Sequence, residues 1–289
     1  MVGAAANPRN RVDEDDDVAV TVRNLGSGSS GNAVLISSPV GTVAVDCGVG
    51  ARALALGLRA AGTALADLDA VLLTHEHADH VRSLPAALAV GVPIVCTAGT
   101  AGAASLPSQQ WQPIARRGEA VVAGLLVRAI PVAHDAAEPC GYVVSAEGVR
   151  VVVVTDLGSP SDELAEHLAD ADLIVVEANH DEMMLRNGPY PERLKQRVLS
   201  ASGHLSNADC GLLLARALSS RGRLRTIWLA HLSTTNNRPG LAQRAVVGAL
   251  AARGASHIVE PLVRHGHHQV WHSSGAGSTS RQLAFDLSD

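Results

Sequence analysis

Apolar residues follow two recurring patterns along this chain: short runs rich in β-branched residues, and longer stretches rich in alanine and leucine. The short runs predict buried strands, and the longer stretches predict helices. In the first half, three strands separated by Gly and Ser-Pro turns suggest an antiparallel meander, which is followed by alternating helices and strands. The predicted strands are 18–25, 33–38, 42–46, 69–74 and 93–97, and the predicted helices are 51–62 and 80–91.

The second half of the chain repeats this order of strands followed by helices. Its predicted strands are 125–132, 141–146, 149–156, 172–178 and 224–231, and its predicted helices are 161–170, 207–220 and 240–254. Two halves of this kind imply two packed sheets with helices on the outside. The pattern therefore predicts an α/β fold, and we see no sequence repeat that would assert a duplication.

The two ends of the chain differ from this core. Residues 1–16 are polar, rich in Asp and aperiodic, so we expect a disordered N-terminal arm, followed by one domain over 17–272. Residues 273–289 begin with a Ser- and Gly-rich stretch that is typical of a flexible tail. The tail ends in QLAFDLSD, which loosely resembles sliding-clamp-binding peptides. A frayed end and a clamp-docking peptide are the two interpretations of this tail.

Composition narrows the class of protein. Hydrophobic residues make up 47% of the 289 residues, but Phe, Trp and Tyr together number six, so the core must consist of Ala, Val, Leu and Ile. The net charge of −5 argues against a general nucleic-acid coat protein. The chain has no signal-peptide core and no apolar window of the ~20 residues that a membrane span needs. Its four cysteines lack metal or disulfide spacing, which favours reduced thiols and a cytoplasmic protein: Cys47, Cys96, Cys140 and Cys210.

A glycine-rich turn after the first predicted strand matches the G-x-G-x-x-G spacing of dinucleotide-binding folds. Gly26, Gly28 and Gly31 form the pattern, and Asp46 follows 20 residues after Gly26. That fingerprint requires a helix N-terminus directly after the glycines. The sequence continues instead with an alternating, β-branched strand. We therefore predict a tight turn at the rim of an active site and no nucleotide.

The most informative stretch is LLTHEHADH, which follows a predicted buried strand. His75, His77, Asp79 and His80 lie within six residues in the pattern H-x-H-x-D-H. Four polar groups at the end of a buried strand must be paired, and packing does not explain them. Alternation directs His75 and His77 the same way, whereas the turn into a helix directs the other two toward a second point nearby. The segment can therefore serve two metal ions.

Further ligands for two ions stand at the ends of later strands. His134, Asp156 and His231 each close an apolar run. Taken together with H-x-H-x-D-H, they are better explained as ligands than as structural residues. Imidazole and carboxylate groups without thiolates fit zinc, with manganese as the competitor. The sequence thus predicts a centre with two divalent metal ions.

These residues and their order resemble the metallo-β-lactamase-fold hydrolases over nearly the whole ordered length. The resemblance implies a four-layer αβ/βα sandwich. It also implies one metal at His75, His77 and His134, a second metal at Asp79, His80 and His231, and Asp156 as a bridge. The stretches GSGSSGN, VDCG, VEANHD, GHLSN and LAHLSTTNN are similar to the YycJ/WalJ-like subgroup, relatives of which act as DNA exonucleases.

The resemblance implies roles for residues beyond the ligands. Asp46 corresponds to an Asp that family members use to orient a ligand histidine. Metal-bound imidazoles usually donate their other ring N–H to a carboxylate of this kind. In tRNase Z-like phosphodiesterases, a histidine and a glutamate in motifs similar to those of His204 and Glu177 protonate the leaving oxygen. Asp79, His204 and Glu177 are therefore the predicted catalytic residues. His180 either lines the site or closes a turn.

The predicted function is hydrolysis of phosphodiester bonds, with DNA or RNA as the expected substrate. A hydroxide shared by two cations attacks the phosphate, and a general acid, worth ~10²–10⁴-fold, assists the poor alkoxide leaving group. The low number of aromatic residues and the negative charge leave a small cyclic phosphodiester as an alternative substrate. A lactone or thioester hydrolase on the same metals, and a partner-binding module without activity, are further alternatives.

Two other segments attract attention. An insertion-like stretch carries groups that suit a phosphate chain: Arg186, Asn187, Tyr190 and Lys195. The later cluster RHGHHQVWH contains four histidines but no carboxylate partner. We predict a solvent-exposed strand edge there and no second metal site.

Overall fold

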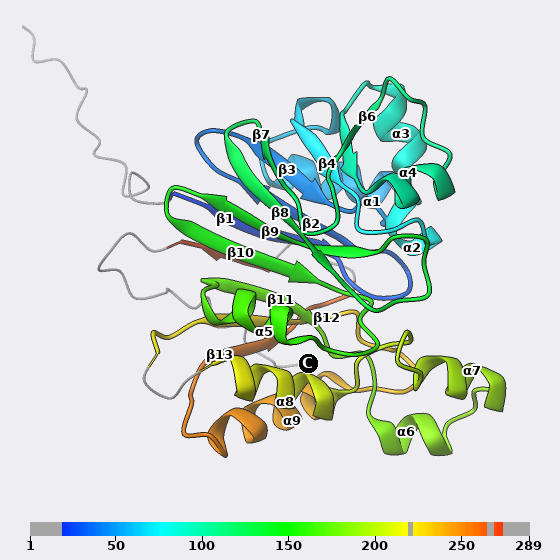
Figure 1. Ribbon diagram of the computed structural model, residues 1–289, viewed down its shortest axis with the longest axis vertical. Coiled ribbons are helices and arrows are strands. Elements are labelled where there is room, and N and C mark those ends of the chain that lie inside the picture. Colours follow the sequence, from blue (N-terminus) through cyan, green and yellow to red (C-terminus); the bar gives the residue numbers. More distant parts are fainter. Residues whose placement is uncertain (1–18, 219–221, 265–268, 274–289) are drawn as a thin grey trace, which may run out of the picture.

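The structure is a computed structural model that describes residues 19–218, 222–264 and 269–273 (Figure 1). The predicted N-terminal arm at 1–16 lies outside the described residues. The same holds for the tail from residue 274 with its clamp-like end, and for three histidines of the late cluster, His265, His267 and His268.

Two seven-stranded sheets form the centre of the described part of the chain. The first sheet is a meander at its start and parallel at its end, since β1, β2 and β3 are antiparallel and β3 to β6 are parallel. Its strands, in spatial order, are β14 (Val270–His272), β1 (Thr21–Gly26), β2 (Ala33–Ser37), β3 (Thr42–Val45), β4 (Ala70–Leu72), β5 (Ile94–Cys96) and β6 (Trp111–Pro113).

The second sheet combines an antiparallel and a parallel part. Strands β7 to β10 are antiparallel, and β10 to β13 are parallel. In spatial order they are β13 (Ile258–Pro261), β12 (Thr226–Ala230), β11 (Leu173–Glu177), β10 (Val149–Val154), β9 (Cys140–Ala146), β8 (Leu125–Pro131) and β7 (Glu119–Val122).

Helices cover the outer face of each sheet (Figure 1). The first sheet carries α1 (Ala51–Ala60), α3 (Leu84–Ala89) and α4 (Ala98–Ala103), and the second carries α5 (Asp162–Ala169), α8 (Asn207–Ala217) and α9 (Pro239–Ala251). The remaining short elements are the 3-10 turn η1 (Leu65–Asp67), α2 (Ala78–Val81), α6 (Glu182–Asn187) and α7 (Glu192–Val198). The last two project from the body at the lower right of Figure 1.

Alternation along the central strands explains the four layers. In β10, Val151 and Val153 point into the core between the sheets, whereas Val152 and Val154 point into the core beneath the outer helices. A strand that is buried on both faces must be apolar throughout, which is why its sequence is a continuous valine run. The predicted four-layer αβ/βα sandwich is confirmed.

The structure differs from the predicted elements at several points. The predicted helix 80–91 is divided into α2 and α3 at Ser83, whose hydroxyl donates to the Val49 carbonyl. Strand β14 pairs with the edge of β1, and His272 on it is exposed, as expected. The pattern did not predict the short elements α4, α6, α7, β6, β7 and β13. A strand, and no helix, follows the glycine turn after β1, as predicted, so the turn lacks the helix N-terminus that a nucleotide fingerprint requires.

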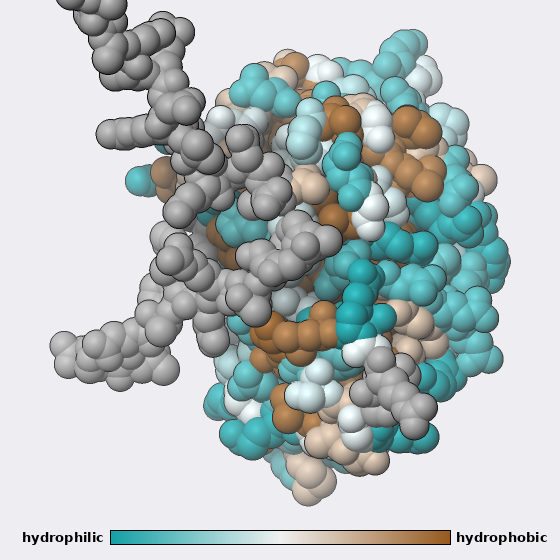
Figure 2. All heavy atoms as spheres, turned by 90° about the vertical axis from the view of Figure 1, so that its left-hand side faces the viewer, coloured by the Kyte–Doolittle hydropathy of each residue, from teal (hydrophilic) through white to brown (hydrophobic). Residues whose placement is uncertain are grey.

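The cysteines, the helices and the surface each show a general property of the described part of the chain. All four cysteines are buried free thiols, as predicted. Among the described helices, none combines the length and the apolar character required to cross a bilayer. On the side that Figure 2 shows, apolar side chains are scattered among polar ones, which is normal for a folded domain surface.

Candidate metal centre

One edge of the two sheets gathers the polar residues that follow the strands. Strands β10, β11 and β12 are parallel, and β8 runs in the same direction because it and β10 are both antiparallel to β9. Their carboxyl ends therefore meet at the same edge. The residues that follow these strands include His134, Asp156 and His231, and the segment after β4 brings His75 to the same place.

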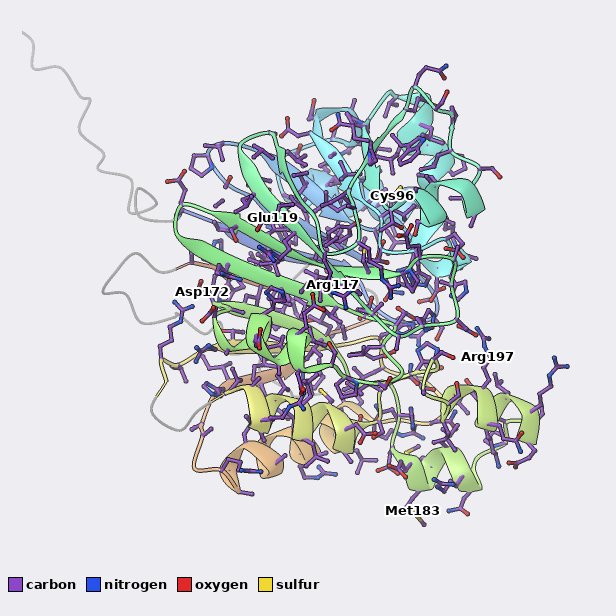
Figure 3. The ribbon with its side chains drawn as sticks, in the orientation of Figure 1. Cys96, Arg117, Glu119, Asp172, Met183 and Arg197 are labelled. Atoms are coloured by element: carbon purple, nitrogen blue, oxygen red, sulfur yellow. The ribbon has the colours of Figure 1, made fainter. Side chains whose placement is uncertain are left out.

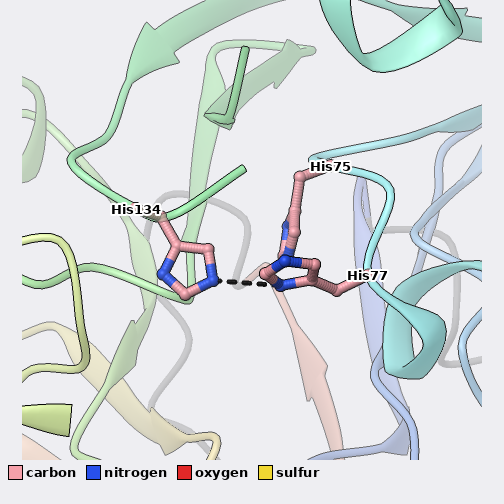
Figure 4. A group of neighbouring side chains, drawn as sticks. All are labelled: His75, His77 and His134. Atoms are coloured by element: carbon pink, nitrogen blue, oxygen red, sulfur yellow. Dashed lines mark hydrogen bonds between the residues drawn. The ribbon is translucent and has the colours of Figure 1, made fainter. Parts of the chain in front are cut away.

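A first group of candidate ligands consists of His75, His77 and His134. Their ring nitrogens lie within 4.8 Å of one another. Figure 4 shows the three rings turned toward one another, with His134 Nε2 at 3.2 Å from His77 Nδ1. His134 Nδ1 donates to the Gly203 carbonyl at 3.1 Å, which leaves Nε2 directed into the group.

A second group consists of Asp79, His80 and His231. His231 Nε2 lies 3.3 Å from Asp79 Oδ2, and His80 Nε2 lies 3.8 Å from the same oxygen. Asp79 and His80 belong to α2, which begins directly after the H-x-H part of the motif. The turn into this short helix thus separates the motif into two groups, as the sequence predicted.

Asp156 lies between the two groups. One of its carboxylate oxygens, Oδ2, is 3.0 Å from His80 Nε2, and the other, Oδ1, is 3.8 Å from His134 Nε2. The residue is 2% exposed, so its charge has no access to bulk water. A buried carboxylate needs cations or donors around it. This one is surrounded by imidazoles from both groups.

Asp46 supports the second group from behind. Its Oδ2 accepts from His80 Nδ1 at 2.7 Å, and both its oxygens accept from the Thr74 hydroxyl. The same hydroxyl lies 3.0 Å from His75 Nδ1. One buried carboxylate therefore orients His80 directly and His75 through Thr74.

Glu177 holds two further histidines. Its Oε1 accepts from His204 Nδ1 and from His231 Nδ1, each at 2.8 Å. Its Oε2 accepts from the backbone amides of Leu157 and Leu205. The carboxylate is 0% exposed and has partners on both oxygens. Its position is fixed, and it fixes both rings.

The donor set fits divalent metal ions. Within the described part of the chain, His75 Nε2 and Asp156 Oδ2 are buried and make no hydrogen bond, although other polar atoms are close. Atoms that converge without bonding each other are arranged around a common point. Imidazole nitrogens and carboxylate oxygens are ligands that zinc and related cations accept. The arrangement has room for two such points, joined by Asp156.

A family model described as the beta-lactamase superfamily domain matches residues 42–225. The chain belongs to this superfamily. The resemblance that the motifs suggested is therefore confirmed.

Relatives of this superfamily chain extend the comparison. It is 33% identical to exodeoxyribonuclease YycJ of Bacillus anthracis over 236 residues, which cover 80% of this chain and 89% of that protein. It is 35% identical to exodeoxyribonuclease WalJ of Streptococcus pneumoniae, with 78% and 87% covered. Among solved structures, the metallo-beta-lactamase fold protein YhfI of Bacillus subtilis matches with a TM-score of 0.65 at 19% identity, with 89% and 100% covered. That last likeness concerns the fold alone.

Backbone conformation directs three residues of this superfamily domain toward the centre. Asp46, Asp156 and His231 follow strands and have φ angles of 61°, 56° and 54°. Non-glycine residues rarely adopt the left-handed region, and such strain concentrates at functional sites. The left-handed backbone conformation turns the chain sharply just after each strand. This turn directs the polar side chain at that position into the site.

Two glycines allow the segments of the site to pack closely. A Cβ at Gly48 would lie 1.6 Å from the Asp79 carbonyl oxygen, and a Cβ at Gly31 would lie 2.4 Å from the Gly48 carbonyl oxygen. Gly31 also has a φ of +145°. These contacts explain why the GSGSSGN and VDCG stretches of the superfamily domain carry glycine at those positions.

Electrostatics differ between the two groups of the superfamily site. Burial, and then the neighbouring His80, lowers the pKa of His75 well below its usual range, and burial lowers that of His134. Burial alone would also lower the pKa of His80, but Asp156 and Asp46 raise it to about 10. Asp156, Asp79 and Glu177 likewise overcome burial and raise the pKa of His231. His75 and His134 therefore favour the neutral form, whereas His80 and His231 favour the protonated form.

The structure brings together most of the residues predicted from sequence. All seven candidate ligands, Asp46, Glu177 and His204 lie in one cluster. His180 is buried but belongs to none of the groups, and neither of its ring nitrogens has a hydrogen-bond partner among the described residues. Its carbonyl accepts from the amide of Asn207 beside Ser206, which caps α8.

Two contributors were not among the predicted site residues. The Thr74 hydroxyl links Asp46 to His75, and the signal was its place directly before the motif. Asn32 accepts from the Gly28 amide and places its own amide nitrogen 3.4 Å from Asp79 Oδ2. A link between Glu177 and His231 was also not predicted, because two residues 54 positions apart carry no local signal.

Proposed function

We propose that this protein is a metal-dependent hydrolase that cleaves phosphodiester bonds and degrades DNA from an end. The DNA part is supported by the curated relatives, which are exodeoxyribonucleases and align over about four fifths of the chain. The phosphodiester part is carried by one observation: a single oxygen of Glu177 holds both His204 and His231 at 2.8 Å.

The seven proposed metal ligands are the six residues of the two groups and the Asp156 carboxylate between them. His75, His77 and His134 would hold one ion, Asp79, His80 and His231 would hold the other, and Asp156 would contribute to both. Two bound divalent ions supply Lewis acidity, which lowers the pKa of water and neutralises charge on an attacked phosphate. We favour zinc over manganese, because five of the seven proposed ligands are imidazoles. Imidazole nitrogens suit a borderline-soft cation such as zinc, whereas manganese prefers oxygen ligands.

His204 acts as the general acid in this proposal. Its Nδ1 donates to Glu177, which orients the ring so that Nε2 is the nitrogen available to the substrate. Its side chain is 18% exposed, whereas that of the neighbouring His231 is 3% exposed. His204 can therefore reach a leaving oxygen from the side of the cluster that substrate approaches. Burial alone would lower the pKa of His204, but the Glu177 carboxylate raises it and keeps a proton available.

The test compares two leaving groups in the metal-loaded full chain. The p-nitrophenolate of bis-p-nitrophenyl phosphate leaves without a proton, whereas the alkoxide of a DNA strand needs one. We expect His204→Ala to reduce kcat on a single-stranded oligonucleotide by about 10²–10⁴-fold. Turnover of the p-nitrophenyl ester should fall far less. Glu177→Gln should weaken both reactions, because it also releases His231.

His272→Ala is the matched control, since it removes an exposed imidazole on β14. An oligonucleotide rate that His204→Ala leaves unchanged would contradict the general-acid role. A wild-type chain that cleaves neither phosphodiester would favour a lactone or thioester hydrolase. A chain that cleaves cyclic dinucleotides but no oligonucleotide would restrict the proposal to small phosphodiesters.

We also assign the hydrolase to residues 17–272. The cytoplasm is the proposed compartment, since four buried free thiols are typical of reducing surroundings.

A further inference from the structure

We propose that α6, α7 and the loop between them, residues 182–198, form a basic arm that binds the backbone and bases of single-stranded DNA beside the metal centre. This inference rests on the proposed function and names the surface that would hold its substrate.

Charge sets the basic arm apart from the rest of the protein. It contains four basic residues and two acidic ones: Arg186, Arg193, Lys195, Arg197, Glu182 and Glu192. The chain as a whole carries −5 and the arm +2, so the residues outside the arm carry −7. An acidic protein that binds a polyanion needs such a local concentration of positive charge.

Exposure makes this charge available to a ligand. Arg193 is exposed and makes no hydrogen bond or ion pair with any residue that the structure describes. The Arg186 side chain is exposed and, among the described residues, makes only a 3.5 Å contact with Glu182 within its own helix. Pairs of that kind contribute little in water and yield readily to a phosphate.

The basic arm adjoins the centre on the side of His204. The Val198 carbonyl at the end of α7 accepts from the His204 amide at 3.0 Å. Arg197 pairs with Asp135 at 2.6 Å, and Asp135 lies 3.4 Å from the candidate ligand His134. In Figure 3, Arg197 lies on the side of α7 toward the body, whereas Met183 points away on the far side of α6. A strand held at the centre would thus continue onto α7.

The arm is fixed in position before any ligand binds. Lys195, the only lysine of the chain, donates from Nζ to the Arg186 carbonyl and ties α7 to α6. A Cβ at Gly188 would lie 2.6 Å from Asn236 Oδ1, so the arm rests closely on that loop. Leu185 and Val198 are buried anchors at its two ends. A surface that is ordered in advance loses less entropy on binding.

Tyr190 gives the arm a platform for a base. It is half-buried and stands between Pro189 and Pro191, which restrict its backbone. The other half-buried aromatic side chains in the described residues, Trp111 and Trp271, pack against core clusters. Stacking on an aromatic ring together with a basic track is how proteins bind single strands without reading sequence.

The experiment measures KM for a single-stranded oligonucleotide as a function of salt, in the metal-loaded full chain. Arg186→Gln combined with Arg193→Gln should raise KM about tenfold. It should also reduce the slope of log KM against log salt by about 1.4, since each lost phosphate contact removes about 0.7 for single strands. Tyr190→Ala should raise KM about tenfold, and Tyr190→Phe should preserve the wild-type value.

Two controls separate this inference from the proposed function. Turnover of bis-p-nitrophenyl phosphate, which is too small to reach the arm, should stay within twofold in every variant. Arg59→Gln combined with Arg253→Gln removes the same charge from exposed sites on α1 and beyond α9. An arm variant that matches this control in KM and salt slope would overturn the inference and leave the nuclease intact. A wild-type chain that cleaves the small ester but no oligonucleotide would overturn both.

Discussion

Both groups of candidate ligands are built around histidines, but these histidines are supported in different ways. In the first group, the Thr74 hydroxyl contacts His75, and the Gly203 carbonyl accepts from His134. These partners are neutral. In the second group, the carboxylate of Asp46 accepts from His80, and that of Glu177 accepts from His231. The second group therefore has a negative charge directly behind each imidazole.

This difference has consequences for metal binding. A carboxylate behind an imidazole fixes its tautomer and makes the opposite nitrogen a stronger ligand. The second group also includes Asp79, a charged ligand of its own. We therefore expect the second group to bind a cation more tightly than the first. The same carboxylates attract protons, so the second group should also depend more strongly on pH.

The largest effect should come from Asp156, the residue that both groups share. Asp156→Asn removes the bridging charge while keeping the size of the side chain. We expect activity on bis-p-nitrophenyl phosphate to fall by more than the roughly 10–100-fold that losing an outer partner costs. Metal content should drop below two equivalents, as measured by elemental analysis. Asp135→Asn, which alters a carboxylate at the rim, is the control and should retain both ions.

A smaller effect should distinguish the two supports. Asp46→Asn removes the charge behind His80, and we expect affinity at the second group to fall about 10–100-fold. Thr74→Val removes a neutral contact at nearly constant volume and should weaken the first group by less. Competitive metal titration with a chelating dye measures both. Equal losses in the two variants would contradict the asymmetry.

The fold was largely predictable because strands that are buried on both faces have continuous apolar sequences. The valine run 151–154 is buried on both faces, and its sequence has no polar interruption. The short elements were not predictable, since helices such as α6 and α7 are six and seven residues long and depend on tertiary contacts. Ser83 shows the same limit: its bond to the Val49 carbonyl divides a segment that local pattern reads as one helix.

The candidate ligands were predictable for a related reason. Polar residues that end apolar runs are costly, so His134, Asp156 and His231 were conspicuous. The residues that hydrogen-bond to these ligands were less conspicuous. Thr74 is a single hydroxyl residue shortly after β4, and the bond between Glu177 and His231 joins the ends of two strands that only the parallel order of β11 and β12 brings together. Local sequence shows which groups need partners, but topology decides which partners they find.

Proton release provides a third test of the asymmetry. In the metal-free protein, Asp156 and Asp46 overcome burial and raise the pKa of His80 from 6.5 to about 10, while burial lowers that of His75. A metal must displace a proton from His80 but not from His75. Between pH 6 and pH 9, affinity should therefore rise steeply at the second group and little at the first. Calorimetry in buffers of different ionisation enthalpy counts the protons.

The same raised pKa has a consequence for stability without metal. A group whose folded pKa exceeds its unfolded value stabilises the fold below the unfolded pKa, and this contribution is lost as pH rises through the folded value. For His80 the loss extends from pH 6.5 to about 10. Thermal unfolding of the metal-free chain should show Tm falling over this window. Asp46→Asn should flatten the decline, and a decline of unchanged steepness in that variant would argue against the assignment.

The smallest effect should come from the rim of the first group. Arg197 and Asp135 form an ion pair at 2.6 Å, but their side chains are 54% and 34% exposed. Exposed pairs contribute about 0–1 kcal/mol, because water screens the attraction and ordering two side chains costs entropy. Arg197→Gln should therefore change the free energy of unfolding by less than about 1 kcal/mol in urea titrations. A loss of several kcal/mol would mean that the first group also relies on charge, and its contrast with the second group would disappear.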